Sequence, residues 1–117
     1  DPAWTFINVH RIFITAARWI ERNMNDVLFE PHTPELWRRV VRELTAYFTG
    51  LLQQGALAGG SAEEAFYVKC DAETNPPEER EVGRIVTEIG LATTVPTEFI
   101  IIRIMHGPTG VRIVGTT

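Results

Sequence analysis

The sequence has little cysteine and no long hydrophobic run. Its one cysteine, Cys70, excludes an internal disulfide framework and gives no hint of an oxidising compartment. The longest apolar candidate, residues 99–102, ends at Arg103, far short of the ~18–20 residues that cross a bilayer. We therefore expect one soluble globular domain in these 117 residues, without direct membrane insertion.

An excess of positive charge is also missing. The chain has 11 Lys and Arg against 15 Asp and Glu, a net charge of −4 and an isoelectric point near 5.3. This balance argues against binding nucleic acid by bulk attraction to phosphates, so we expect no nucleic-acid partner. The sequence begins at Asp1 rather than at methionine and shows no signal-peptide pattern, so we expect a processed chain or a fragment of a longer protein.

The residue types that hold metals or perform nucleophilic catalysis are sparse. His10, His32 and His106 are isolated, without a second ligand type three or four residues away, so we expect no metal site. Cys70 alternates with Phe66 and Val68 in a strand-like pattern, which favours a buried, inert thiol over a nucleophile.

Two further motifs are weak candidates for chemistry. Glu78, Glu79 and Glu81 crowd a proline-containing segment, and an exposed acidic loop is a better interpretation than an acid–base pair. The segment 59–61, Gly-Gly-Ser, lacks the lysine and the full glycine pattern of a phosphate-binding loop. We predict no enzymatic activity and no cofactor.

Helical periodicity dominates the first half of the chain. Apolar residues recur every three or four positions over residues 8–24, where Asn8 is a plausible N-cap. A second helix is predicted over residues 34–54, because Thr33 can cap it and Pro34 suits the first helical position.

Strand-like patterns dominate the second half. They predict strands at 66–70, 84–91, 99–105 and 111–114, with a bulge or bend at Gly90 and both faces of 99–105 buried except at Arg103. Residues 73–81 contain Pro76 and Pro77 and are predicted to be an exposed connection. The order of elements predicts an α+β fold: two long N-terminal helices packed on a small, mostly antiparallel sheet of three to four strands.

One basic cluster stands out on the second predicted helix, formed by Arg38, Arg39 and Arg42. Its simplest interpretation is a solvated face, which is usual for an amphipathic helix. A docking face for an acidic protein partner is the second interpretation. Nucleic acid comes third, since no aromatic platform surrounds these arginines.

Four strings, taken in order, carry a family resemblance. They are DPAWTFINVHRIF, VLFEPHTPELWRRV, QGALAGGSAEEAFYVKCDAETNPPEE and EVGRIVTEIGLATTVPTEFIIIRI. Together they resemble the conserved C-terminal domain of contractile tail sheath proteins, which occur in myophage tails, R-type bacteriocins and related phage-like injection particles. Two departures are His10-Arg11, where many relatives carry two arginines, and the continuation of the chain beyond the last common strand to Thr117.

The resemblance implies a structural subunit without a catalytic site. Such subunits polymerise with copies of themselves into a helical sheath around a tail tube protein, are linked by strand-donating terminal arms, and contract to drive the tube through the target envelope. It also implies a location in the virion tail or a phage-like particle, assembled in the cytoplasm of the bacterial host.

These implications give a division of the chain and two sets of candidate contact residues. We expect residues 1–106 to form the conserved domain and residues 107–117 to form an arm or extension. The β-branched run with Val111, Ile113 and Val114 follows a Gly-Pro break and is predicted to link subunits by strand addition. Arg38, Arg39 and Arg42 are predicted to contact the tube or a neighbouring subunit.

The competing interpretation is a stand-alone small α+β domain that binds a ligand or catalyses a reaction. It requires a pocket with converging polar groups, such as Cys70 and His106 brought together.

Overall fold

The computed structural model describes residues 2–26, 32–53, 66–92 and 99–115. Two long helices, α1 (Pro2–Asn23) and α2 (Pro34–Gln53), precede a sheet of four strands. The strands are β1 (Phe66–Lys69), β2 (Ile85–Ala92), β3 (Phe99–Gly107) and β4 (Gly110–Gly115), and a short helix, α4 (Pro77–Glu81), lies between β1 and β2. The predicted α+β class is confirmed.

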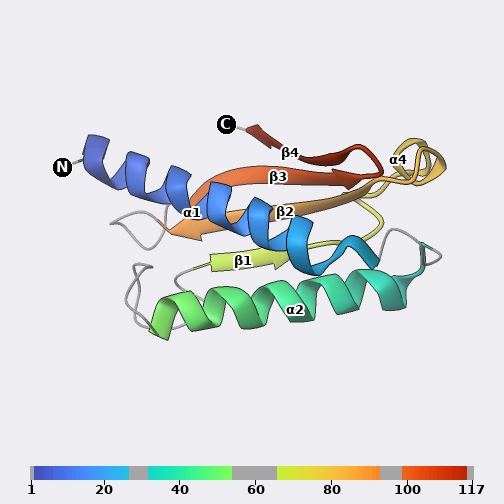
Figure 1. Ribbon diagram of the computed structural model, residues 1–117, viewed down its shortest axis with the longest axis horizontal. Coiled ribbons are helices and arrows are strands. Elements are labelled where there is room, and N and C mark those ends of the chain that lie inside the picture. Colours follow the sequence, from blue (N-terminus) through green and yellow to red (C-terminus); the bar gives the residue numbers. More distant parts are fainter. Residues whose placement is uncertain (1, 27–31, 54–65, 93–98, 116–117) are drawn as a thin grey trace.

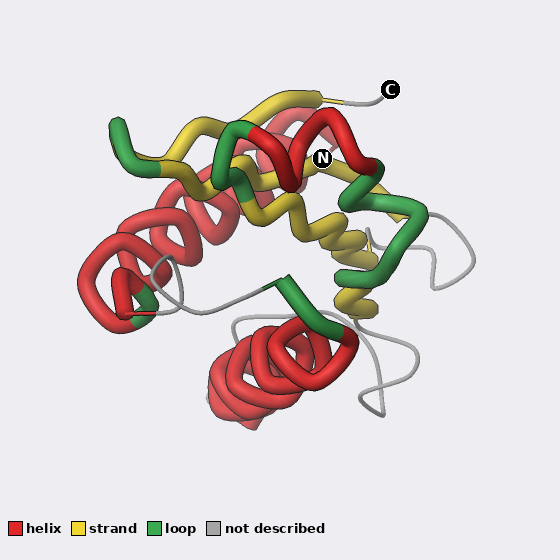
Figure 2. Tube along the Cα trace, turned by 90° about the vertical axis from the view of Figure 1, so that its right-hand side faces the viewer, coloured by secondary structure: helices red, strands yellow, loops and turns green. Residues whose placement is uncertain are grey.

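The sheet is fully antiparallel, with its strands in the order in which they occur in the chain, β1-β2-β3-β4. Both long helices lie on the same face of this sheet (Figures 1 and 2). Helix α1 contacts β3 and β4, whereas α2 contacts β1. The molecule therefore has two layers, and each long helix covers one half of the sheet.

The core fills the space between these layers. Helix α2 buries one stripe with the three- to four-residue spacing that was predicted, and its side chains meet buried residues of α1 and of the inner sheet face. The buried apolar residues of the helices are Ile12, Phe13, Ala16, Ala17, Ile20, Leu36, Trp37, Val40, Leu44 and Phe48. Those of the strands on the helix side include Phe66, Ile85, Ile89, Leu91, Ile102 and Ile104.

The two helices differ in how well their starts were predicted. Helix α2 begins at Pro34 as expected, and the Leu36 amide donates to the Thr33 hydroxyl at 3.2 Å, which makes Thr33 the N-cap. Helix α1 begins at Pro2, so the predicted start near Asn8 is wrong. Proline is compatible with the first helical turn, and residues 3–7 contain no helix breaker, so Pro2 opens this helix as Pro34 opens the other.

The connection between β1 and β2 also departs from expectation. Residues 73–81 are not simply an exposed loop, since Thr74 and Asn75 are buried and Pro77 opens the short helix α4. A proline at the first helical position loses no hydrogen bond, which is why Pro76-Pro77 is compatible with this turn of helix.

The predicted bulge at Gly90 is absent, because β2 pairs without interruption on both sides. Gly90 lies opposite Tyr67 on one neighbour and Ile101 on the other. A Cβ atom at position 90 would lie 2.1 Å from the Tyr67 ring. Glycine is therefore needed here to make room for an aromatic ring rather than to bend the strand.

Strand β3 is buried on one face only, so the prediction of burial on both faces is wrong. Ile102, Ile104 and His106 point toward the helices and are buried, whereas Ile101 and Met105 on the outer face are half-exposed. An antiparallel sheet that is covered by helices on one side leaves its other face to solvent.

Candidate functional site

The expected arm begins with a tight turn and a strand of the same sheet. Residues 107–110 form the turn, in which Pro108 and Thr109 separate the paired glycines Gly107 and Gly110. Gly110 has φ of 123°, a conformation that side chains with a Cβ rarely adopt, so glycine is required at this corner.

The three residues predicted to link subunits lie on β4, at the end of the sheet order. Val111 pairs with His106, Ile113 with Ile104 and Val114 with Arg103. Val111 and Ile113 are partly buried against the core, whereas Val114 is exposed on the outer face. Within the described residues, β4 pairs with β3 of its own chain and with no second strand, so its other edge can accept hydrogen bonds from a further strand.

The basic cluster on α2 is divided between two environments. Arg39 forms an ion pair with Asp26, with Nη2 at 2.8 Å from Oδ2, and its Nε lies 3.6 Å from Glu43 Oε2. Arg38 and Arg42, one helical turn apart, are exposed. Arg39 thus ties α2 to the segment that follows α1, while Arg38 and Arg42 form the outward part of the cluster.

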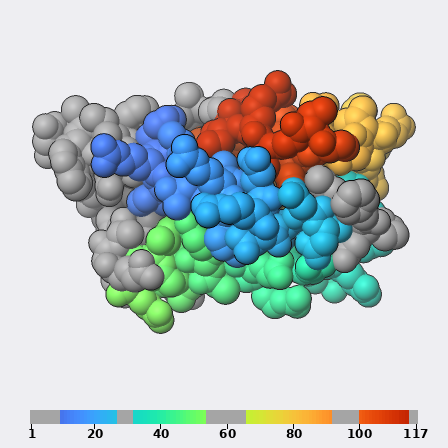
Figure 3. All heavy atoms as spheres, in the orientation of Figure 1, coloured from blue at the N-terminus to red at the C-terminus, as the bar shows by residue number. Residues whose placement is uncertain are grey.

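Helix α1 adds further positive charge to the same layer. Its exposed face carries Arg11, Arg18 and Arg22, while its only acidic residue is Glu21. Figure 3 shows α1, in blue, as a prominent part of the surface on this side of the molecule, above the green of α2. The helical layer is therefore basic although the whole chain carries a net charge of −4.

The residues considered above as candidates for chemistry make packing, hydrogen-bond or ion-pair contacts or are exposed. Cys70 is 6% exposed, and burial raises the pKa of its thiol to about 11, so the reactive thiolate is disfavoured at neutral pH. His32 accepts a hydrogen bond from the Trp37 indole at 3.3 Å, and burial, with Arg80 nearby, lowers its pKa. Glu79 pairs with Arg84, with Oε2 and Nε 2.8 Å apart, whereas Glu78 and Glu81 are exposed.

His106 is the most buried of these polar candidates. It is 3% exposed, and its Nε2 faces Asn25 Oδ1 at 3.1 Å, which joins β3 to the segment after α1. Burial lowers its pKa, and the Glu21 charge opposes this only in part. The cavity beside it measures about 10 Å³, has no lining from Cys70 and is too small for an organic ligand. The convergence of Cys70 and His106 required by the alternative interpretation is therefore not found at this cavity.

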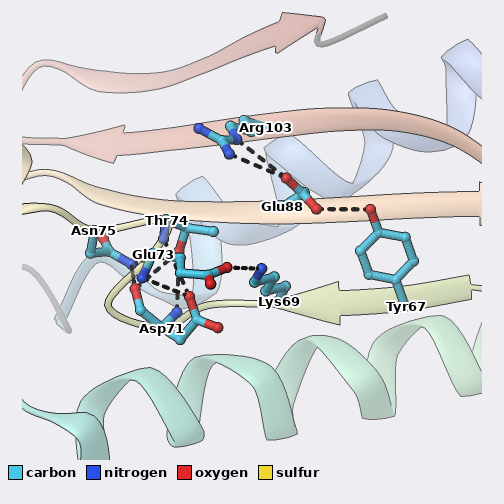
Figure 4. Close-up of polar contacts among 8 residues, drawn as sticks. All are labelled: Tyr67, Lys69, Asp71, Glu73, Thr74, Asn75, Glu88 and Arg103. Atoms are coloured by element: carbon cyan, nitrogen blue, oxygen red, sulfur yellow. Dashed lines mark hydrogen bonds and ion pairs between the residues drawn. The ribbon is translucent and has the colours of Figure 1, made fainter.

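The segment after β1 contains a buried polar cluster that sequence reasoning missed (Figure 4). Asn75 is fully buried, and its side chain makes two hydrogen bonds to the backbone of Val86, accepting from the amide at 2.8 Å and donating to the carbonyl at 3.0 Å. It also donates to the Asp71 carbonyl at 3.0 Å. One side chain thus acts as an additional strand partner for the start of β2. A lone asparagine between acidic residues and prolines gave no signal of this role.

A second missed feature crosses the outer face of the sheet. The Tyr67 hydroxyl donates to Glu88 Oε2 at 2.8 Å, and Arg103 lies 3.4 Å from Glu88 Oε1, so one carboxylate bridges three strands (Figure 4). Burial and the bond to Glu88 raise the pKa of Tyr67 to about 12. The alternation of each strand predicted which face these residues occupy, but the cross-strand register that aligns them needed the structure.

The described part of the chain shows neither a metal site nor a membrane span. Within the described ranges, no group of three or more His, Cys, Asp and Glu side chains is placed to hold a metal ion. Among the described helices, none combines the length and apolar character needed to span a membrane.

Comparison with known proteins identifies relatives. The family described as phage tail sheath C-terminal domain matches residues 1–105. Among solved structures, the chain is similar to the sheath of an extracellular contractile injection system, the PVC sheath complex in the contracted state, with a TM-score of 0.62 and 36% sequence identity. The match covers 77% of this chain and 26% of that sheath chain, so it spans about a quarter of the larger protein. No curated protein matches the chain.

Proposed function

Because the chain belongs to the phage tail sheath C-terminal domain family, we propose that it is part of a structural subunit of a contractile tail sheath. The observation that carries this proposal is the family match over residues 1–105, supported by the 36% identity to a contractile injection system sheath. The subunit polymerises with copies of itself into a helical sheath around a tail tube protein and contracts to drive the tube through the target envelope. It acts without catalysis, cofactor, nucleic acid or insertion into a membrane.

The proposed location is a virion tail or phage-like particle, assembled in the cytoplasm of the bacterial host. Expression of the full-length subunit in bacteria, followed by negative-stain electron microscopy of the cytoplasmic extract, tests both polymerisation and location. Tubular sheaths in the extract are the expected result. A monodisperse monomer at high concentration, with and without tube protein, would contradict the proposal.

We place the linkage between subunits in residues 107–117, through Val111, Ile113 and Val114. In a single chain these residues form β4 at the edge of the sheet, where backbone groups can pair with another chain. Opening the Gly107–Gly110 turn would let the same strand pair with a neighbour instead, an exchange that preserves the backbone hydrogen bonds. Residues 1–106 would then be the conserved domain and 107–117 the arm.

Deletion of residues 107–117 from the full-length protein tests this linkage. Electron microscopy should show no ordered sheaths, because the main-chain pairing between subunits is lost. Removal of residues 116–117 alone is the matched control and should preserve assembly. Normal sheaths from the longer deletion would rule out the linkage.

We further propose that Arg38, Arg39 and Arg42 mark a face that meets an acidic surface of the tube or of a neighbouring subunit. The exposed pair, Arg38 and Arg42, makes the contact, while Arg39 supports it through its ion pair with Asp26. Charge reversal in R38E/R42E should impair assembly at physiological salt, with R39E added as a second step. Unchanged assembly of the triple variant would exclude this face.

A further inference from the structure

A polar hollow lies beside the turn between β3 and β4. It measures about 350 Å³ and is lined by residues of the turn and of both strands: Arg84, Met105, Gly107, Thr109, Gly110, Val111 and Arg112. The turn and the α4 segment lie at the same end of the molecule (Figures 1 and 3). Two arginines from different parts of the chain meet at this hollow, and none of the described residues that line it is acidic.

Arg84 is held in place by its surroundings. Its side chain crosses Gly107 so closely that a Cβ at that position would lie 2.9 Å from the Arg84 Cγ. Its guanidinium is paired with Glu79, with Nε at 2.8 Å from Oε2 and Nη2 at 3.5 Å from Oε1. The side chain of Arg84 remains 36% exposed. Arg84 is therefore pre-positioned at the edge of the hollow, although its own charge is balanced.

Arg112 contributes the uncompensated charge. It is exposed, and the hydrogen bond that the structure shows for it runs from Nη2 to the sulfur of Met105 at 3.6 Å. A thioether is a weak acceptor and carries no charge. Among the described residues, no carboxylate forms an ion pair with Arg112, so its planar set of donors can bind an anion.

We propose that this hollow is a recognition site for a carboxylate side chain on an acidic segment of a partner polypeptide. Arg112 binds the carboxylate through two N–H donors, the geometry that guanidinium and carboxylate groups share. Met105, which pairs with Arg112 across β3 and β4, gives the hollow an apolar side. The methylene groups of a glutamate side chain can cover this apolar side, whereas inorganic phosphate has no apolar part that could do so. This proposal rests on the proposed function only for the source of the acidic segment, which would be another component of the sheath. Binding of an acidic peptide to the hollow can therefore be tested on the chain alone.

An NMR titration tests the site directly. The probe is an N-acetylated, C-amidated tetraglutamate peptide, added to the 117-residue chain at low salt. We expect saturable shifts of the amide signals of Gly107, Gly110 and Val111. Tetraglutamine and inorganic phosphate, the two comparison probes, should bind at least about tenfold more weakly.

Variants separate recognition by Arg112 from general charge. R112Q should weaken tetraglutamate binding about tenfold, and R112K should retain part of the affinity, because lysine keeps the charge but not the paired donors. R18Q removes one exposed arginine from α1 and should leave the affinity unchanged. Absence of saturable shifts, equal binding of phosphate, or equal affinity of R112Q would each overturn the proposal. None of these results depends on whether sheaths form.

Discussion

The two connections between neighbouring strands that lie within the described residues are built in opposite ways. Between β1 and β2 the chain takes a long path whose buried Asn75 bonds to both backbone groups of Val86. Between β3 and β4 it takes a tight turn with glycines at both ends, and the strand that follows ends the sheet with Val114 exposed. One connection is fixed by buried polar groups, whereas the other depends on strand pairing and partial burial. Within one small sheet, the start of β2 is held by buried polar groups, and β4 is the strand that we propose is exchanged between subunits.

Removal of the buried Asn75 side chain should have the largest effect on the difference between the two connections. In N75A the Val86 amide and carbonyl lose their partners in a buried setting, which should lower the free energy of unfolding by about 3 kcal/mol. Urea denaturation measures this value. N23A is the control, because Asn23 is an exposed helix-end residue with a single bond to the Trp19 carbonyl, and it should cost less than about 1 kcal/mol. Equal effects of the two variants would show that the Asn75–Val86 hydrogen bonds do not hold this connection in place.

Gly90 offers a second test of the contacts between β1 and β2. In G90A the new methyl group would collide with the Tyr67 ring and displace it from Glu88, at a cost of about 1–3 kcal/mol in unfolding free energy. G50A is the control, because a Cβ there meets nothing within 4 Å and alanine favours a helix by up to about 1 kcal/mol. In a Y67A background most of the penalty at Gly90 should disappear, and a persistent penalty would mean that the ring is not its cause.

The pH dependence of stability tests the contact that His106 makes between β3 and the segment after α1. Burial lowers its pKa in the folded protein, so protonation favours the unfolded chain. Its contribution to stability is complete above the unfolded pKa near 6.5 and is lost as the pH falls below that value. The urea midpoint should therefore decrease as the pH is lowered from 7.5 to 5.5. The pKa of His32 is also lowered, so His32 contributes in the same direction.

H106Q keeps an amide donor for Asn25 Oδ1 but cannot be protonated. Its urea midpoint should depend less on pH than that of the parent chain. H10Q changes an exposed histidine and serves as the control. If H106Q leaves the pH dependence unchanged, protonation of His106 does not contribute to the loss of stability at low pH.

The sequence predicted the elements better than the contacts between them. Helix α2 was placed correctly because Thr33, Pro34 and a long apolar stripe agree, and the strands were found from their alternation. The start of α1 was missed because Asn8 resembles a cap while the proline at position 2 is equally compatible with a first turn. Local patterns of this kind specify secondary structure but not its exact ends.

The functional features depend on partners that are distant in the sequence. Gly90 looked like a bend because the Tyr67 ring that requires it lies on another strand. Asn75 and His106 make their hydrogen bonds with Val86 and Asn25, which no spacing in the sequence connects to them. The hollow with Arg84 and Arg112 likewise forms only when β2 and β4 flank β3. Charge and periodicity cannot reveal such pairings, because they arise from the tertiary register.

The most direct test of the proposed exchange of β4 is native-state hydrogen exchange, read amide by amide by NMR. We expect β4 amides to exchange through local opening at rates at least about tenfold higher than those of β2, whose amides exchange only with global unfolding. Equal protection of β4 and β2, with both tracking global stability in urea, would contradict the claim that β4 is released more easily than the rest of the sheet.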